Sequence, residues 1–334
     1  MPSTCSQQSA VTPLLTKVSI PEVTKFLTGL TLFPERFYTS KNGVDAANWI
    51  AARCKELPVP AGTKLTISLF NHTGFIQPSV IARYESATPP ADGFKGTIII
   101  GSHFDTATNG TKGNEDAIDG PNPGADDCSS GSTSVFEALR VLTTQGFIPG
   151  RALEFHWYAA EEVGLYGSIE IARQYAKQGR DVVGYLNLDQ TGYVRARTTP
   201  IVGIFSSEST APATKFISSV VATYSGLPQV GGQKCDEELC SDNFSWTRYG
   251  FESAMLMESG IKNTFPYNDM VKPDGSPLDT LDVVNMTHVA VFAKIALGWT
   301  VELSLATAKS SSAGSFVGYE TAFFLLVGSL LVYL

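Results

Sequence analysis

Four short segments of this chain carry acidic side chains or a histidine, three of them at the end of an apolar run. The segments are GTIIIGSHFD with His103 and Asp105, NPGADDCSSG with Asp126 and Asp127, EFHWYAAEE with Glu161 and Glu162, and YLNLD with Asp189. Several carboxylates gathered around one imidazole repel one another unless cations neutralise them. We therefore expect a divalent metal here, and a mixed nitrogen and oxygen ligand set favours zinc, with cobalt or manganese as alternatives.

The NPGADDCSSG segment is the centre of this pattern. It sets two adjacent acids in a turn rich in Gly, Pro and Ser, directly before a helical run. A lone Asp-Asp pair in such a turn is more often a solvated loop than a ligand. The three other acidic segments favour the ligand interpretation.

The order of predicted elements explains how these segments meet. Strand-like runs at 64–70, 79–86, 96–105, 151–160, 182–192, 199–207 and 253–259 alternate with helical runs at 14–55, 129–145, 166–179, 211–226 and 283–299. This alternation predicts an α/β three-layer sandwich, with a mixed, mostly parallel twisted sheet flanked by helices. We expect one domain over residues 14–303. Ligands of such sheets gather at the carboxyl ends of the strands.

Composition excludes some partners. The formal net charge is −8, from 24 Lys and Arg against 32 Asp and Glu, and the basic residues are scattered. Binding of nucleic acid requires a concentrated basic face, so we expect no nucleic-acid partner. The sequence gives no indication of oligomeric state.

Cysteines and glycosylation triplets favour a secreted protein. Cys235 and Cys240 enclose the loop CDEELC, whose spacing suits a small disulfide loop better than a zinc knuckle. Four N-x-[ST] triplets begin at Asn71, Asn109, Asn243 and Asn285. Together these features point to the secretory route.

The two ends of the chain give different indications. Residues 1–13 are expected to be a leader or a disordered N-terminus, although no signal peptide is legible. Residues 304–334 carry small residues, a short spacer and an apolar tail, the layout of a GPI-attachment signal. We expect a secreted or cell-surface protein. The alternative is a hydrophobic tail that packs on the domain.

The motifs GSHFDT, NPGADDCSSG, YAAEEVGLYGS and LNLDQTGY, in this order, resemble those of the co-catalytic dizinc aminopeptidases related to the bacterial secreted leucyl aminopeptidase. These enzymes belong to the superfamily of aminopeptidases, glutamate carboxypeptidases and glutaminyl cyclases, with a zinc-peptidase/phosphorylase-like fold. The likeness covers nearly all of residues 14–303. It implies two Zn²⁺ ions and peptide substrates with a free N-terminus.

The resemblance also implies roles for individual residues. Asp126 would bridge the two zinc ions, His103 and Asp189 would bind one of them, and Glu162 the other. Glu161 would be the general base, since a carboxylate beside a metal-activated water takes its proton and passes it to the leaving amine.

Two further acids receive supporting roles from the resemblance. Asp105 would orient His103 through its other ring nitrogen, and Asp127 would support the turn. Cys128 stands where relatives often have Asp or Asn, and the sequence gives it no function.

One ligand of the family is missing. Relatives supply a second histidine to the Glu-bearing metal, and an ungapped count from Glu258 puts Asp269 at that place. We expect Asp269 to substitute as a ligand. The alternatives are a centre with one firm and one loose metal, or an inactive one.

Substrate preference is implied by position. Met257 and Ile261 would line the pocket for the first side chain of the substrate, with Gln190 near its mouth, and their apolar character favours Leu, Met or Phe. The alternative is that Met257 and Ile261 are core residues. The CDEELC loop lacks the tyrosine with which relatives stabilise the tetrahedral intermediate.

These expectations define a zinc-dependent aminopeptidase that removes N-terminal apolar residues by a two-metal activated water. Two alternatives remain: a catalytically impaired relative acting as a binding ectodomain, and a single-zinc enzyme similar to glutaminyl cyclase.

Overall fold

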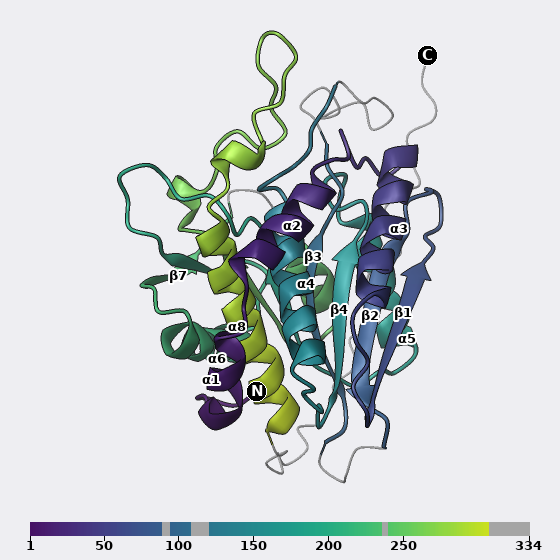
Figure 1. Ribbon diagram of the computed structural model, residues 1–334, viewed down its shortest axis with the longest axis vertical. Helices are drawn as coiled ribbons and strands as arrows, with labels where there is room; N and C mark the ends of the chain where they lie inside the picture. The colour runs from purple at the N-terminus through teal and green to yellow at the C-terminus, as the bar shows by residue number, and fades with distance from the viewer. Residues whose placement is uncertain (89–93, 108–119, 236–239, 307–334) are drawn as a thin grey trace, which may run out of the picture.

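A single eight-stranded sheet forms the centre of the protein, with the strand order β1-β2-β4-β3-β5-β8-β6-β7. The computed structural model describes residues 1–88, 94–107, 120–235 and 240–306 (Figure 1). The strands are β1 (Thr63–Phe70), β2 (Ser79–Ser86), β3 (Thr97–His103), β4 (Ala152–Tyr158), β5 (Val182–Leu188), β6 (Val202–Phe205), β7 (Gln229–Gln233) and β8 (Ser253–Met257).

The middle of the sheet is parallel and its margins are partly antiparallel. Strands β4, β3, β5 and β8 run parallel to one another, and β6 runs parallel to β7. The pairs β1/β2, β2/β4 and β6/β8 are antiparallel. The predicted mixed, mostly parallel α/β sandwich is confirmed.

Helices cover both faces of the sheet. One core joins the first face to α1 (Gln8–Leu15), α2 (Ile20–Leu30), α3 (Lys41–Lys55), α4 (Ser129–Thr144), α6 (Ala211–Tyr224) and α8 (Met286–Leu305), and Figure 1 shows these helices in front of the strands. A second core joins the other face to α5 (Tyr166–Lys177) and α7 (Asn243–Arg248). The single-turn helices η1 (Ile261–Asn263) and η2 (Leu281–Val283) follow β8.

Strand β3 shows why the sequence adopts this layering. Its residues Ile98, Ile99 and Ile100 are all fully buried. Successive side chains of a strand point to opposite faces, and Ile98 and Ile100 join the first core while Ile99 joins the second. A continuous apolar run is therefore what this central parallel strand requires.

Helix α8 is the one helix among the described residues that is long and apolar enough to cross a membrane. Its most apolar stretch is 89% buried inside the fold, and it packs against α1, α2, α4 and α6. We therefore interpret α8 as a core helix.

Residues 1–13 differ from the expected leader or disordered segment. Helix α1 buries Val11 and Leu14 in the main core. Ahead of it, the backbone N–H groups of Ser6 and Gln7 donate to the buried carboxylate of Glu302 in α8, at 2.8 and 3.0 Å. The chain enters the fold before residue 14, because this carboxylate and the apolar face of α1 anchor it. The predicted GPI-like segment was 304–334. Helix α8 continues to Leu305, and residues 307–334 lie outside the described part of the chain.

Removing the Glu302 carboxylate tests this anchoring. Besides the two backbone groups, Glu302 accepts a hydrogen bond from the hydroxyl of Tyr224. Glu302→Ala leaves these donors without a partner, so we expect the free energy of unfolding to fall by about 1–3 kcal/mol. Urea denaturation measures it. As a control, Glu56→Ala removes an exposed ion pair with Arg53 and should cost less than about 0.5 kcal/mol. Equal losses in both variants would contradict a docked N-terminus.

Candidate metal centre

The candidate site lies at the carboxyl edge of the parallel strands. Strand β3 ends at His103, β5 ends one residue before Asp189, and β4 ends three residues before Glu161. Because β4, β3 and β5 are parallel neighbours, these chain ends meet at one edge. Helix α4 begins there, directly after the turn that contains Asp126, Asp127 and Cys128.

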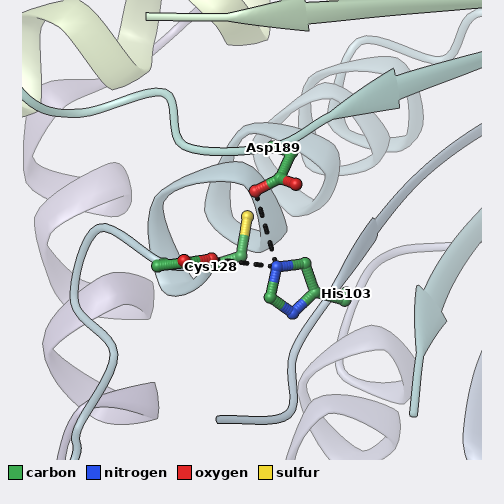
Figure 2. A group of neighbouring side chains, drawn as sticks. His103, Cys128 and Asp189 are labelled. Carbon is green, nitrogen blue, oxygen red and sulfur yellow. Dashed lines mark hydrogen bonds and ion pairs between the residues drawn. The ribbon is translucent and has the colours of Figure 1, made fainter. Parts of the chain in front are cut away.

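A first group of potential metal ligands consists of His103, Asp127, Cys128 and Asp189. One ligand atom from each lies within 4.8 Å of the others, and all four residues are buried. The Nε2 atom of His103 lies 3.0 Å from Oδ1 of Asp127 and 3.5 Å from Oδ1 of Asp189. Figure 2 shows the side chains of His103, Cys128 and Asp189 turned toward one another from separate segments.

A second group consists of Asp127, Glu162 and Asp269, whose carboxylate oxygens also lie within 4.8 Å of one another. Asp269 comes from the loop after β8, where the backbone adopts the left-handed conformation with φ 61°. The Nδ2 atom of Asn122 donates to Oδ1 of Asp269, at 3.3 Å. Asp269 stands in the segment where relatives supply a second histidine, and this segment thus places a carboxylate at the site.

Asp127, and not Asp126, belongs to both groups. Oδ1 of Asp126 instead accepts hydrogen bonds from the backbone N–H groups of Gly192 and Tyr193, at 2.9 and 3.1 Å. The two adjacent side chains leave the turn in different directions. The roles expected for them are therefore exchanged: Asp126 supports the turn, and Asp127 faces the possible cations.

The turn is held from outside by two residues that sequence reasoning did not assign to the site. The fully buried Arg36 donates from its guanidinium to the carbonyl oxygens of Phe104, Pro123 and Gly124. The carboxylate of Asp279 accepts from the backbone N–H of Asp126 at 2.8 Å and of Asp127 at 2.9 Å.

Arg36 keeps its charge in this position. Burial lowers its pKa to about 10, although Asp279 and Asp105 oppose the decrease. A guanidinium with that pKa is protonated at neutral pH, and its charge partly offsets the acids around the turn.

Asp105 links the histidine to the Glu161–Glu162 turn. Its Oδ1 lies 3.5 Å from Nδ1 of His103. Its two oxygens accept from the backbone N–H groups of Glu161 and Glu162, at 3.0 and 3.2 Å. Ala160, just before this turn, donates its N–H to Gln77. Asp105 thus lies near Nδ1 of His103, and it fixes the backbone of both glutamates.

Gln190, expected near the mouth of the substrate pocket, contacts the cluster directly. Its Nε2 donates to Oδ2 of Asp127 at 3.0 Å, and Nδ2 of Asn268 donates to the same oxygen at 2.8 Å. The two amides fix the orientation of the Asp127 carboxylate. The sequence predicted Gln190 beside an apolar pocket, and nothing in that expectation indicated a hydrogen bond to Asp127.

Met257 and Ile261 lie together at an apolar surface beyond the cluster. Met257 packs with Phe205 and Met255, while Ile261 and the disulfide-bonded Cys235 and Cys240 pack against them. The disulfide expected from CDEELC is present, although residues 236–239 lie outside the described part of the chain. Met257 is only 6% exposed, so it is a core residue of this group.

The electrostatics of the site favour cations. Burial raises the pKa of Glu161 well above its ordinary value, with Asp189 adding to the rise against the effect of His103. Burial also raises the pKa of Glu162 strongly, and Asp269 and Asp127 add to it. Buried carboxylates with this tendency hold protons or exchange them for cations, because either removes the repulsion.

His103 and Asp127 stabilise each other's charge. Burial alone lowers the pKa of His103, but Glu161 and the nearby carboxylates of Asp105 and Asp127 raise it well above the ordinary value. Burial alone raises the pKa of Asp127, but the hydrogen bond and charge of His103 lower it. A proton on Nε2 of His103 thus occupies the position where a cation would sit.

Buried polar atoms without a hydrogen-bond partner test whether these residues fit a metal. Within the described residues, such atoms include Oδ1 of Asp189, Oε1 of Glu162 and Nδ1 of His103. Buried polar groups are nearly always satisfied, and cations at the two groups would satisfy the two carboxylate oxygens. The donor set therefore fits divalent metal.

Comparison with known proteins agrees with this geometry. The model of peptidase family M28 matches residues 79–299. The probable aminopeptidase YDR415C of Saccharomyces cerevisiae is 36% identical over 308 residues, covering 90% of this chain and 78% of that protein. Leucine aminopeptidase 1 of Arthroderma otae is 32% identical over 315 residues, covering 91% and 79%.

A solved structure shares the fold over the same extent. The LapA aminopeptidase of Legionella pneumophila superposes with a TM-score of 0.79 at 26% identity, over 92% of this chain and 77% of that chain. The resemblance inferred from the four motifs is confirmed. The chain belongs to peptidase family M28, and it is a hydrolase that acts on peptide bonds.

Proposed function

We propose that this peptidase is a zinc-dependent aminopeptidase with divalent cations on both sides of Asp127. The observation that carries the proposal is the position of Asp127 in both ligand groups. His103 and Asp189 would hold one cation, and Glu162 and Asp269 the other. When bound, such a pair supplies a water of lowered pKa and polarises the scissile carbonyl.

Glu161 is the proposed general base. It is the first residue of a turn whose backbone is fixed by Asp105, and it neighbours the proposed ligand Glu162. Burial raises its pKa, which makes its carboxylate a stronger base. The carboxylate takes the proton of the attacking water and gives it to the leaving amine.

A preference for a free N-terminus follows from the charges of the site. Glu161, Glu162 and Asp189 are acids that attract the α-ammonium group of a peptide. The buried guanidinium near the site, that of Arg36, binds three backbone carbonyls and does not serve a substrate carboxylate. Relatives named as leucine aminopeptidases support the same preference.

The apolar group around Met257 supports a preference for an apolar first residue. Ile261, Phe205 and the Cys235–Cys240 disulfide flank it. Leu, Met or Phe side chains would gain most from contact with this surface.

We also propose that the protein acts outside the cell, at the cell surface or after secretion. The Cys235–Cys240 disulfide supports this, since disulfides persist in oxidising compartments. Of the four glycosylation triplets, Asn243 is fully buried and donates Nδ2 to the carbonyls of Ser207 and Glu208, so it is unsuited to carry a glycan. Asn71 and Asn285 are exposed, and Asn109 lies outside the described residues.

The identity of the bridging residue is tested by two matched variants. Asp127→Asn removes the carboxylate common to both groups, so we expect loss of both metals. Asp126→Asn keeps an oxygen that accepts from Gly192 and Tyr193, and it should retain both. Metal content after dialysis, measured by mass spectrometry, distinguishes them. If only the Asp126 variant loses metal, Asp126 is the bridging residue, as first expected, and the assignment of Asp127 is wrong.

The role of Glu161 is tested with aminoacyl chromogenic substrates. Glu161→Gln should lower kcat by about 10²–10⁴-fold, the usual contribution of a general base, while metal content stays unchanged. N-acetylation of a leucyl substrate should abolish hydrolysis by the unmodified enzyme. Full activity in the variant, or equal cleavage of the acetylated substrate, would argue against the proposal.

Attachment to the cell surface is tested on intact expressing cells. A phosphoinositide-specific phospholipase should release the active peptidase into the medium if a GPI anchor is attached. A variant ending at residue 306 is the control and should be found in the medium without treatment. Membrane-bound peptidase that resists the phospholipase would exclude the anchor.

A further inference from the structure

The first ligand group contains a sulfur atom. Cys128 is fully buried, and its Sγ lies among the ligand atoms of His103, Asp127 and Asp189. Figure 2 shows this thiol beside the carboxylate of Asp189 and the imidazole of His103. Asp189 is only 6% exposed. Its Oδ1 accepts no hydrogen bond from any described residue. The thiol therefore adjoins an unsatisfied ligand atom.

The thiol also has contacts outside the first group, and it donates to the carbonyl oxygen of Leu188 at 3.6 Å. Sγ lies 3.1 Å from Oγ of Ser102 and accepts from the backbone N–H of Gln190 at 3.4 Å. A cysteine that binds a metal does so as the thiolate, having lost its proton. A nitrogen, sulfur and oxygen set is of the kind that selects zinc over harder ions.

The second ligand group contains oxygen alone. Its members are the carboxylates of Asp127, Glu162 and Asp269, and the neighbouring side chains Asn122 and Asn268 contribute amides directed at these carboxylates. Carboxylate-only sets suit harder cations such as Mn²⁺ or Mg²⁺. Nothing in this set gives zinc the advantage that imidazole would give it.

The remaining histidines of the chain are engaged elsewhere. His72 contacts Glu170 and Ser79 at 2.9 and 2.7 Å. His156 contacts Glu154 and Tyr158. His288 contacts the backbone carbonyl of Glu258. With His103 in the first group, all four histidines of the sequence are accounted for, and the second group gains no imidazole from this chain.

We propose that the two positions bind different metals: zinc at the His103–Cys128 position and a harder divalent cation, with Mn²⁺ as the representative, at the all-carboxylate position. Cys128 supplies a sulfur ligand to the first position. This inference rests on the proposed function, because it requires both positions to be filled.

Competition between Zn²⁺ and Mn²⁺ tests the inference on the intact protein. Metal-free protein is dialysed with one equivalent of Zn²⁺ and an excess of Mn²⁺, and bound metals are counted by mass spectrometry. We expect about one zinc and one manganese per chain. The electron paramagnetic resonance spectrum of the manganese should show a single kind of bound site. The inference would be overturned if half of the chains bound two zinc ions each, the other half bound none, and no manganese was bound.

Asp269→His tests the origin of the selectivity. Histidine tolerates the left-handed backbone that Asp269 adopts. The variant presents an imidazole to the second position, so we expect manganese to be lost from it and a second zinc to bind when two equivalents are supplied. Unchanged manganese binding in the variant would contradict a selectivity set by the carboxylates.

Cobalt reports on the sulfur ligand. One equivalent of Co²⁺ should produce a thiolate-to-cobalt charge-transfer absorption that Cys128→Ser abolishes, with about tenfold or greater loss of zinc affinity at one position. Cys54→Ser is the control, since Cys54 is a buried free thiol in α3. No such absorption in the unmodified protein would remove Cys128 from the ligand set.

The outcomes separate the inference from the proposed function. If the protein binds two zinc ions firmly and cleaves leucyl substrates, the proposed function is supported and the inference about different metals is wrong. If it binds no divalent metal at either position, both the proposed function and the inference are wrong.

Discussion

The repulsion among buried carboxylates at one edge of the sheet is the constraint on which the site depends. Asp127, Asp189, Glu162 and Asp269 approach one another with a single imidazole among them. Such a cluster is stable only if protons or cations compensate its charge. The raised pKa values of Glu161 and Glu162 reflect that requirement. Bound divalent metal would meet it and would also supply the chemistry of peptide hydrolysis.

The surrounding structure holds these acids in place against their repulsion. Arg36 binds three carbonyls around the Asp126–Asp127 turn, and Asp279 accepts the two backbone N–H groups of the same turn. Asp105 does the same for the Glu161–Glu162 turn. Each turn is fixed by a side chain from a distant part of the sequence, and these contacts position the acids of the site.

The sequence predicted the layers of the fold and the meeting of four motifs. Apolar runs such as that of β3 are characteristic of central parallel strands, and the carboxyl ends of such strands meet at one edge. It did not predict which of two adjacent aspartates turns toward the other possible ligands: the resemblance assigned the bridging role to Asp126, whereas Asp127 belongs to both groups. That choice depends on hydrogen bonds from Gly192 and Tyr193, about 65 residues away in the chain, and no local pattern encodes them. The docking of the N-terminus on Glu302 escaped prediction for the same reason.

The most direct test of the account is the position of bound metal in a crystal of the zinc-loaded peptidase. Anomalous scattering should show two cations about 3.5–4 Å apart, one on each side of the Asp127 carboxylate, with Asp126 in contact with neither. A single cation, or a pair that shares Asp126, would contradict the central claim.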